Sequence, residues 1–264
     1  MGMAGWATPP ASGAPGATPA TAAPGRQPVH ALPPADSLQQ AFDTTEALRT
    51  QRRFRDMLEL LHRLQDEHPG NVNVLYRLAF TWSDLGKAAE SERRAVHFFQ
   101  QAVAAAGKAL AADSTSAWAH FAMAVAQGRL ALHASTRERV ERSRAVKAHA
   151  ERAIALDSTL AGAYHVRGRW HREAADLNFF QRAIVAAIYG GLPEASIDQA
   201  VADFRTAIAL EDRAYHHLEL GKTYLTIDRP DAARTQLREA LDAPGADPFD
   251  PVYKREAHQL LDAL

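Results

Sequence analysis

The 264-residue sequence contains no cysteine, which excludes disulfide bonds, thiolate zinc sites and cysteine nucleophiles. It also lacks an excess of charge of one sign. The 30 basic and 31 acidic residues give a formal net charge of −1, so the whole molecule is not a polycation suited to nucleic acid or anionic membranes. No proline occurs between Pro69 and Pro193, and no stretch shows the alternation of a β-strand. These absences favour an all-α fold.

The first 35 residues have a composition of their own. They hold 8 of the 14 prolines, 5 glycines and 10 alanines, and Arg26 is their one charged residue. Such a segment buries too little apolar surface to offset its ordering entropy. We therefore expect a disordered tail over 1–36 and a helical domain over 37–264. The tail does not resemble a signal peptide, so we expect a cytoplasmic location for this chain, and a periplasmic or anchored one if translation starts upstream.

Helix pairs recur along the domain with the period of a tetratricopeptide repeat, which has 34 residues and small residues where its two helices cross. The segment 214–243 fits, with Gly221, Ala233 and Ala240 at positions 8, 20 and 27. Four similar units precede it. Three units are longer than 34 residues, with additions at roughly 87–97, 128–140 and 174–195. The pattern predicts a tetratricopeptide-repeat-like superhelix of about five antiparallel pairs, followed by a C-terminal capping helix over 250–263.

The register of the repeats predicts which residues serve packing. Small side chains at the helix crossings let two backbones approach each other, and these are Ala79, Ala122, Gly168 and Gly221. Trp170 follows position 9 on its helix, where it turns toward a neighbouring element, so we expect a buried, structural ring.

The order of motifs resembles the regulator of microtubule dynamics family over about 40–264. The resemblance rests on Gly168-Arg169-Trp170 in the first helix of a repeat, followed by an aromatic-led apolar helix at 179–192 and a turn at Pro193. It implies a non-enzymatic interaction domain, linked in animals to microtubules and organelle contacts, and only this resemblance makes tubulin a partner. The alanine- and arginine-rich composition is typical of a bacterial member.

The motifs, taken without the family resemblance, also predict a protein that is not an enzyme. Gly221-Lys222-Thr223 resembles the end of a P-loop, but His216 stands where the first glycine belongs and no strand leads in. His165 and His171 lie six residues apart and do not share a helix face. We therefore expect no metal site and no cofactor.

Membrane lipid and nucleic acid are two further classes of partner, and a structural or solvated helix is the competing interpretation for each segment. The apolar helix at 177–192 is too short and too interrupted to span a membrane, and its single Arg182 is less than an interfacial helix normally carries. The stretch 129–152 holds seven basic and three acidic residues without interleaved aromatics, so a solvated helix face is favoured over nucleic-acid binding. Peripheral membrane or envelope tethering through 177–192 stays as the alternative function.

The favoured function is binding of a partner protein in a concave groove. Positions 2, 5, 9, 12 and 13 of first helices normally line that face, and in this register they include Arg49, Tyr76, Phe80, His165, Arg169, Arg172 and Lys222. Arginine grips carboxylates with two parallel hydrogen bonds, so the groove is predicted to bind an acidic, extended segment. Glu46, Asp84 and Glu173 share the face, and internal salt bridges are the alternative.

Overall fold

The computed structural model describes residues 38–264, apart from the side chains of Phe179, Phe180 and Ile184. The tail predicted over 1–36 lies outside this part. The described residues form twelve α-helices and no strand. In chain order they are α1 (Leu38–Thr50), α2 (Phe54–Glu67), α3 (Val72–Lys87), α4 (Glu92–Ala112), α5 (Ala117–Ala131), α6 (Thr136–Leu156), α7 (Ala161–Ala175), α8 (Phe179–Tyr189), α9 (Ile197–Leu210), α10 (Ala214–Thr226), α11 (Pro230–Asp242) and α12 (Asp250–Asp262).

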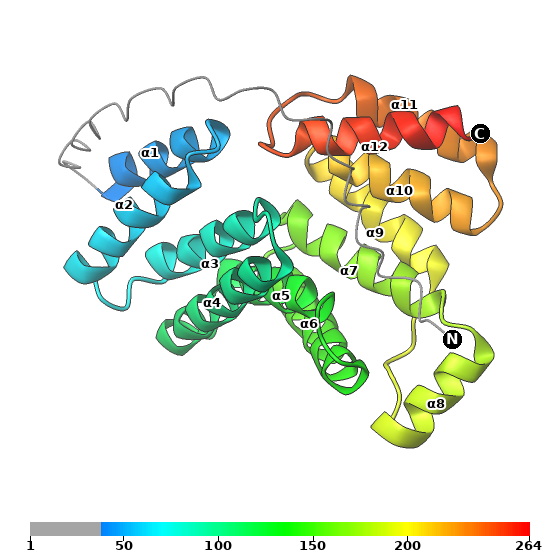
Figure 1. Cartoon of the computed structure of the whole chain (residues 1–264), viewed down its shortest axis with the longest axis horizontal. Helices are drawn as coiled ribbons and strands as arrows, with labels where there is room; N and C mark the ends of the chain where they lie inside the picture. Colours follow the sequence, from blue (N-terminus) through cyan, green and yellow to red (C-terminus); the bar gives the residue numbers. More distant parts are fainter. Residues whose placement is uncertain (1–37) are drawn as a thin grey trace, which may run out of the picture.

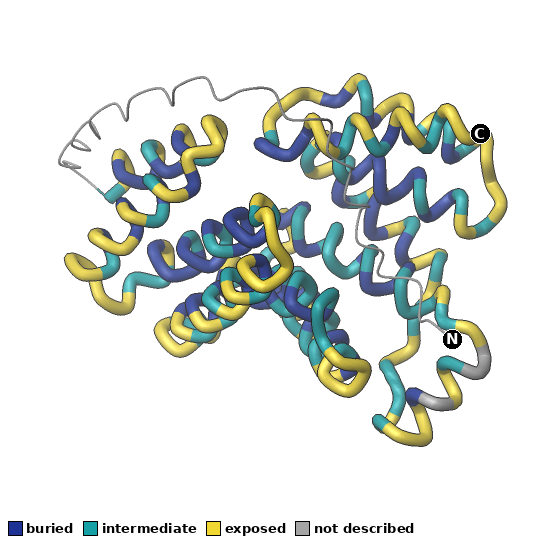
Figure 2. The backbone as a smooth tube through the Cα atoms, viewed as in Figure 1, coloured by how far each residue is buried: buried dark blue, intermediate teal, exposed yellow. Residues whose placement is uncertain are grey.

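The helices pack as successive antiparallel pairs, which gives the predicted all-α, tetratricopeptide-repeat-like superhelix (Figure 1). The pairs are α1 with α2, α3 with α4, α5 with α6, α7 with α9, and α10 with α11, while α12 packs on α10 and α11. The first helices α3, α5 and α7 also contact one another in turn, so they form one wall of the arc. Buried residues follow the faces that adjoining helices share (Figure 2).

Polar side chains fix where several first and second helices begin. The side chain of Asn71 accepts hydrogen bonds from two amides of α3, and the Ser116 hydroxyl accepts one from the Ala119 amide of α5. Ser135 and Glu138 form the complete capping box at the start of α6. The hydroxyl of Ser196 likewise caps α9. These caps place the starts of α3 and α5 at equivalent points of their repeats.

Glycines let the helices of a pair approach closely, as predicted for Gly168 and Gly221. A Cβ atom on Gly168 would lie 3.1 Å from the ring of Phe204, and one on Gly221 would lie 2.9 Å from Leu237. Ala79 is fully buried at the same point of its repeat. Ala122 is buried too, but it packs in the core cluster shared with α3 and α4.

The extended inserts take two forms. The helices α4 and α6 have 21 residues each and so exceed an ordinary repeat helix. The insert at 174–195 contains α8, which stands off the body and contacts α6 (Figure 1). Arg144 of α6 holds the end of α8 by donating hydrogen bonds to the carbonyl oxygens of Tyr189 and Gly191. Ile188 of α8 is 65% exposed. No helix in the described part is long and apolar enough to cross a membrane.

The two ends of the superhelix meet. The loop between α11 and α12 lies against α1, α2 and α3, on the side where Figure 1 shows the first and last helices facing each other. Arg49 forms an ion pair with Asp247 at 2.9 Å, and Arg52 donates a hydrogen bond to the carbonyl of Pro248. The rings of Phe54 and Phe249 stack with their centroids 5.7 Å apart. We call these the closing contacts, because they turn the arc into a ring around a central cavity.

Candidate functional site: a central cavity

The central cavity has a volume of about 650 Å³ and is lined mainly by α3, α5 and α7, with α1 and the α12 region completing the wall. This volume lies within the range of ordinary ligand sites, roughly 300–1,000 Å³. Five of the seven predicted groove residues line it: Arg49, Tyr76, Phe80, His165 and Arg169. The structure therefore brings most of the predicted face together around one space.

Arg172 and Lys222 do not line the cavity. Arg172 is only 6% exposed, and its guanidinium contacts the carboxylates of Glu173 and Glu219, each at 2.7 Å. Lys222 bonds to Glu219 and to Glu256 of α12, at 3.2 and 2.8 Å. Both cations thus join elements of the scaffold, because α10 packs on α7 and α12 packs over α10.

Arg49 lies in the cavity wall but is held by two acids. Its Nε donates to Asp84 at 2.8 Å, and its Nη2 donates to Asp247 at 2.9 Å. Burial lowers the pKa of Arg49, but these two carboxylates outweigh it, and the net pKa is raised. Burial raises the pKa of Asp247, yet Arg49 and Lys87 bring it below its ordinary value. This pair holds the ring together and leaves Arg49 little capacity for a ligand.

His165 contributes a neutral ring to the wall. His165 Nδ1 lies 3.0 Å from Nδ1 of His216, and its ring also meets Tyr215 edge to face. Burial, followed by the charge of the neighbouring histidine, holds the pKa of His165 well below its ordinary value. Burial lowers the pKa of His216 to about 3. One neutral ring can therefore donate to the other, and His165 adds no positive charge at neutral pH.

Arg169 keeps a looser ion pair. Its Nε lies 3.6 Å from Glu219, which is farther than the 2.7 Å contact of Arg172 to the same carboxylate. Burial raises the pKa of Glu219, but Arg172, Arg169 and Lys222 together hold it well below its ordinary value. Glu219 is thus an anion shared among three cations, and Arg169 is the member that faces the cavity.

The cavity is also lined by cations that the sequence did not single out, among them Lys87 and Arg129. Lys87 donates a 2.7 Å hydrogen bond to the hydroxyl of Tyr253 and lies 3.4 Å from the ring centroid of Phe249. Burial and then the charge of Arg129 lower the pKa of Lys87 to about 7. Burial also lowers the pKa of Arg129. Within residues 38–264, the Arg129 guanidinium has no hydrogen bond and no ion pair within 4 Å.

Aromatic side chains occupy another part of the wall. Tyr76 and Trp118 stack at 5.5 Å, and Phe80 lies 5.1 Å from Phe121. We call these four residues the aromatic cluster. Trp118 is 43% exposed, although it carries one of the largest apolar side chains. Phe121 rests on the start of α7, where a Cβ on Gly162 would lie 2.2 Å from its ring. The cavity therefore combines apolar rings with fixed positive charge.

A family model described as Regulator of microtubule dynamics protein 1-3 matches residues 37–264. The chain belongs to the regulator of microtubule dynamics family. Among the curated relatives, regulator of microtubule dynamics protein 1 of Bos taurus is 27% identical over 194 residues, which cover 72% of this chain and 61% of the bovine protein. The Caenorhabditis elegans protein of the same name is 25% identical over 223 residues, covering 84% and 98%. The chain thus matches less than two thirds of the bovine relative's length.

A solved structure shares the fold of this family member. A thermophilic TPR protein of Thermus thermophilus superposes with a TM-score of 0.60 at 22% sequence identity, and the match covers 84% of this chain and 98% of the other. At this identity the likeness concerns the fold alone. It agrees with the tetratricopeptide-repeat architecture that the helix pairs show.

The motif that carried the resemblance to the regulator family has a divided role in the structure. Gly168 gives room to Phe204, and Arg169 faces the cavity. Trp170 is 2% exposed, and its indole N–H donates a 2.9 Å hydrogen bond to the hydroxyl of Ser143 on α6. The prediction of a buried, structural ring is confirmed.

The third repeat explains why Trp118 and Arg129 were missed. The small residue Ala122, taken as position 8 of the third repeat, makes Trp118 position 4, which is a packing position. In the structure α5 begins after the Ser116 cap, two residues later than that register requires. Counted from the caps Asn71, Ser116 and Leu160, the fifth residues are Tyr76, Phe121 and His165, and the thirteenth are Asp84, Arg129 and Glu173, all of which line the cavity. Alignment on helix caps, in place of small residues, would have found them.

Proposed function

We propose that the chain is a non-enzymatic interaction domain that binds an extended, acidic segment of a partner protein in the central cavity. The observation that carries this proposal is an aromatic cluster, of which Trp118 is exposed, together with two cations. Arg129 has no ion pair among the described residues, and Arg169 has only a loose one. An extended segment can contact both features, because it can present an apolar side chain to the aromatic cluster and acidic side chains that neutralise Arg129 and Arg169. The tetratricopeptide-repeat fold supports the proposal, since its first helices present such a concave face.

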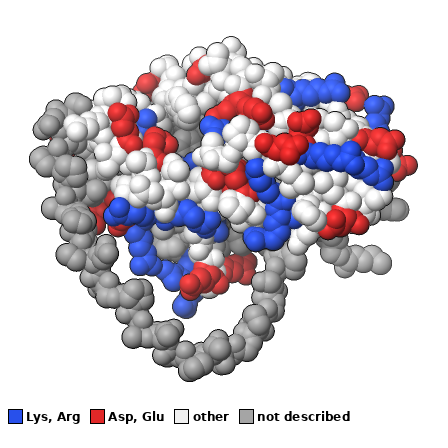
Figure 3. Space-filling model, turned by 90° about the horizontal axis from the view of Figure 1, so that it is seen from above, with Lys and Arg blue, Asp and Glu red and all other residues white. Residues whose placement is uncertain are grey.

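Internal ion pairs favour a smaller set of binding residues than the repeat register predicts. Arg49, Arg172 and Lys222 are engaged in internal ion pairs, as the alternative interpretation required. The residues that support binding are therefore Arg129, Arg169 and the aromatic cluster. Basic and acidic patches lie side by side on the face shown in Figure 3, which fits a protein partner better than a nucleic acid.

Membrane or envelope tethering through 177–192 is the weaker alternative. The guanidinium of Arg182 donates hydrogen bonds to the carbonyl oxygens of Leu177 and Ala175, so it is engaged within the segment. Val185 of α8 is buried, which leaves less apolar surface for lipid. An interfacial helix with one engaged cation has little attraction for anionic lipid.

Affinity capture from the cell that encodes the protein tests the proposal. Wild type is compared with the double variant Trp118→Ala, Arg129→Gln, and with Arg137→Gln as a matched control, because Arg137 pairs with Glu141 on the outer side of α6. We expect wild type and control to capture the same partners through an acidic segment that cross-linking maps to the cavity. We expect the double variant to lose them, and capture to weaken with salt.

Retention of the same partners by a folded double variant would contradict cavity binding. The relatives are named for microtubule dynamics, and tubulin is one candidate identity of the captured partner. Capture of tubulin would support the proposal only if the contact maps to the cavity and depends on Trp118 and Arg129.

A further inference from the structure

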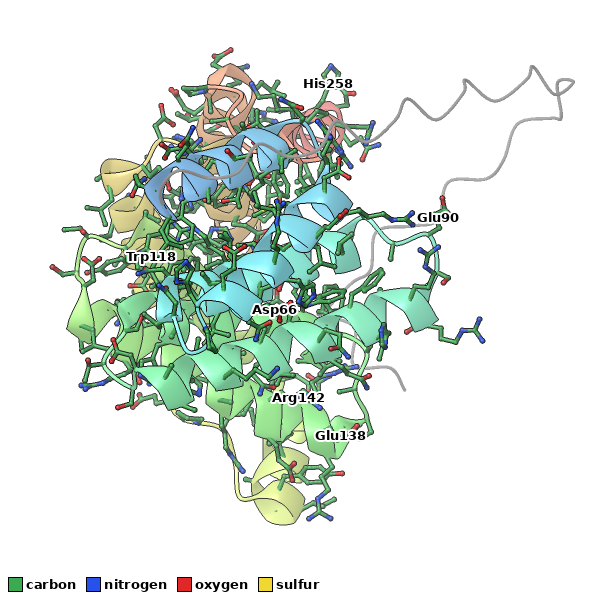
Figure 4. All side chains as sticks on the ribbon, turned by 90° about the vertical axis from the view of Figure 1, so that its left-hand side faces the viewer. Asp66, Glu90, Trp118, Glu138, Arg142 and His258 are labelled. Carbon is green, nitrogen blue, oxygen red and sulfur yellow. The ribbon has the colours of Figure 1, made fainter. Side chains whose placement is uncertain are left out.

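The aromatic cluster lies at the N-terminal ends of α3 and α5. Tyr76 is the fifth residue of α3 and Trp118 the second of α5, and their stacked rings show that the two helices start side by side. In Figure 4, Trp118 lies on the opposite side of the molecule from Glu90, which follows the C-terminal end of α3. The exposed face of Trp118 is therefore at one end of the cavity.

The cations lie at the other end of the same helices. Lys87 is the last residue of α3, and Arg129 lies in the last turn of α5. Arg169 of α7 is the third cation of this group. After the larger effect of burial, the charge of Arg129 lowers the pKa of Lys87, and the charge of Arg169 lowers the pKa of Arg129. Like charges held together in a hollow favour an anion between them. We call Lys87, Arg129 and Arg169 the cationic end.

Along α5 the cavity wall therefore changes from aromatic to cationic, and two acids of the same end, Asp84 and Asp247, are paired with Arg49. Trp118, Phe121, Val125 and Arg129 follow one another on the cavity face of α5, from aromatic to cationic. Arg129 lies eight positions after Phe121, and at 1.5 Å per residue this is about 12 Å along the helix axis. An extended chain advances roughly 3.3–3.6 Å per residue, so about three or four residues of a bound segment cover that length.

We propose that the cavity recognises a two-point motif: a large apolar side chain bound at the aromatic cluster and an Asp or Glu three or four residues away, bound at the cationic end. This inference rests on the proposed function and adds the spacing of the partner's residues. Charge complementarity selects the acid, because Arg129 has no carboxylate within 4 Å among the described residues. The aromatic cluster selects the apolar side chain, and Phe121, its member nearest to Arg129 along α5, sets the spacing.

Synthetic peptides test the spacing. The probes are fluorescein-labelled, C-terminally amidated peptides of Gly, Ser and Ala that carry one Phe and one Glu, separated by one to seven positions and placed in both orders. Matched peptides carry Gln in place of Glu. Fluorescence anisotropy at low salt measures the affinity of the full chain for each peptide. We expect the affinity to peak at spacings of three and four, and to fall about tenfold when Glu becomes Gln at those spacings.

Variants assign each point of the motif to its residue. Arg129→Gln should remove the preference for Glu over Gln while affinity for the Gln peptides is kept, because the cation that selects the acid is gone. Trp118→Ala should weaken the binding of peptides with Phe and leave the binding of matched peptides with Gly in place of Phe unchanged. Arg137→Gln should behave as wild type. Circular dichroism and thermal melting confirm folding, and Arg129→Lys, which keeps the charge, serves as a second variant and should retain part of the preference.

The outcomes separate this inference from the proposed function. Binding that does not vary with spacing, or a preference for Glu that persists in Arg129→Gln, would overturn the two-point motif and leave the interaction domain standing. Binding of acidic peptides that is insensitive to Trp118 would also overturn it, and would indicate a site for a small anion. Absence of binding by every peptide at millimolar concentration, together with capture unaffected by the double variant, would overturn both.

Discussion

The buried position of Lys87 disfavours its charged form in the ligand-free chain, and the same position suits the binding of an anion. Its ammonium group lies in the cavity with a tyrosine hydroxyl and an aromatic face as neighbours, and the acids nearest to it are bound to Arg49. A buried lysine without a close carboxylate favours its neutral form. A bound anion would reverse that balance, so Lys87 is a residue where ligand and proton are coupled.

This coupling gives a pH-dependent stability. The pKa of Lys87 is about 7 in the folded chain and 10.5 ordinarily. Below pH 7 both states hold the proton, and the cost of the buried charge is fully present. Between pH 7 and 10 the unfolded state binds more protons, so the free energy of unfolding rises with pH. Urea unfolding between pH 7 and 9.5 should show this rise.

Replacement of Lys87 by Met should flatten the rise of the free energy of unfolding with pH. Lys108→Met is the matched control, because Lys108 is an exposed lysine on α4, and its rise should equal that of wild type. A Lys87→Met chain with the wild-type slope would show that Lys87 keeps its proton in the folded state.

At the scale of the helix, the sequence predicted which helices pair, but it did not predict the residue at which α5 begins. Apolar spacing and small residues placed one repeat at 214–243, which contains α10 and α11, because Gly221 and Ala233 leave one way for two helices to cross. In α5, alanines occur at almost every candidate crossing position, so small size carried no register information. Only the cap at Ser116 fixes where the helix starts, and with it the direction of Trp118.

Ion pairing was the other feature that the sequence left open. Position within a repeat indicated that arginines and acids share the concave face, and it could not show which of them meet. Arg49 reaches Asp247, 198 positions away, because the superhelix closes into a ring. Arg172 is buried because α10 packs against its helix. Both outcomes depend on the path of the whole chain, which local pattern does not encode.

Substitution by alanine at two glycines of adjoining helices should change the free energy of unfolding in opposite directions. A Cβ on Gly86 of α3 would lie 2.3 Å from the ring of Phe99, which is 3% exposed and has no room to move. Gly86→Ala should lower the free energy of unfolding by about 1–3 kcal/mol. A Cβ on Gly107 of α4 would meet only the tip of Met123, at 3.9 Å.

Gly107→Ala should therefore raise the free energy of unfolding by roughly 0.5–1 kcal/mol, since it removes the conformational cost of a helical glycine. Denaturant titration of both variants measures the difference. A loss of stability in both, or a gain in both, would contradict the assignment of Gly86 as the close contact between α3 and α4.

For the molecule as a whole, the contacts that close the superhelix into a ring determine the width of the cavity and so the size of segment that it can bind. Each repeat of a superhelix touches its neighbours, so its curvature is soft unless the ends are joined. Here the loop before α12 joins them through the closing contacts, which are one ion pair, one ring stack and the hydrogen bond from Arg52, with Lys87 against the ring of Phe249. These few contacts set the distance across the cavity, and a long partner segment needs that distance to adjust.

Removal of the closing contacts should open the ring. The chain has no cysteine, so spin labels can be placed at will. In an otherwise wild-type chain, labels at Arg55→Cys on α2 and His258→Cys on α12 should give a narrow distance distribution by pulsed electron paramagnetic resonance. The added changes Asp247→Asn and Phe249→Ala should lengthen and broaden that distribution, because the ion pair and the ring stack are lost together.

A control pair at Arg55→Cys and Arg93→Cys reports on α2 and α4, which lie on the same side of the closure, and it should not change. An unchanged distribution for the α2–α12 pair would show that the stacking of α3, α5 and α7 alone fixes the curvature. In that case the cavity would be a rigid site of constant width. If the distribution does broaden, a tightly binding peptide with the two-point motif should narrow it again. A segment that contacts Trp118 and Arg129 of α5 and Arg169 of α7 bridges two adjoining repeats of the ring.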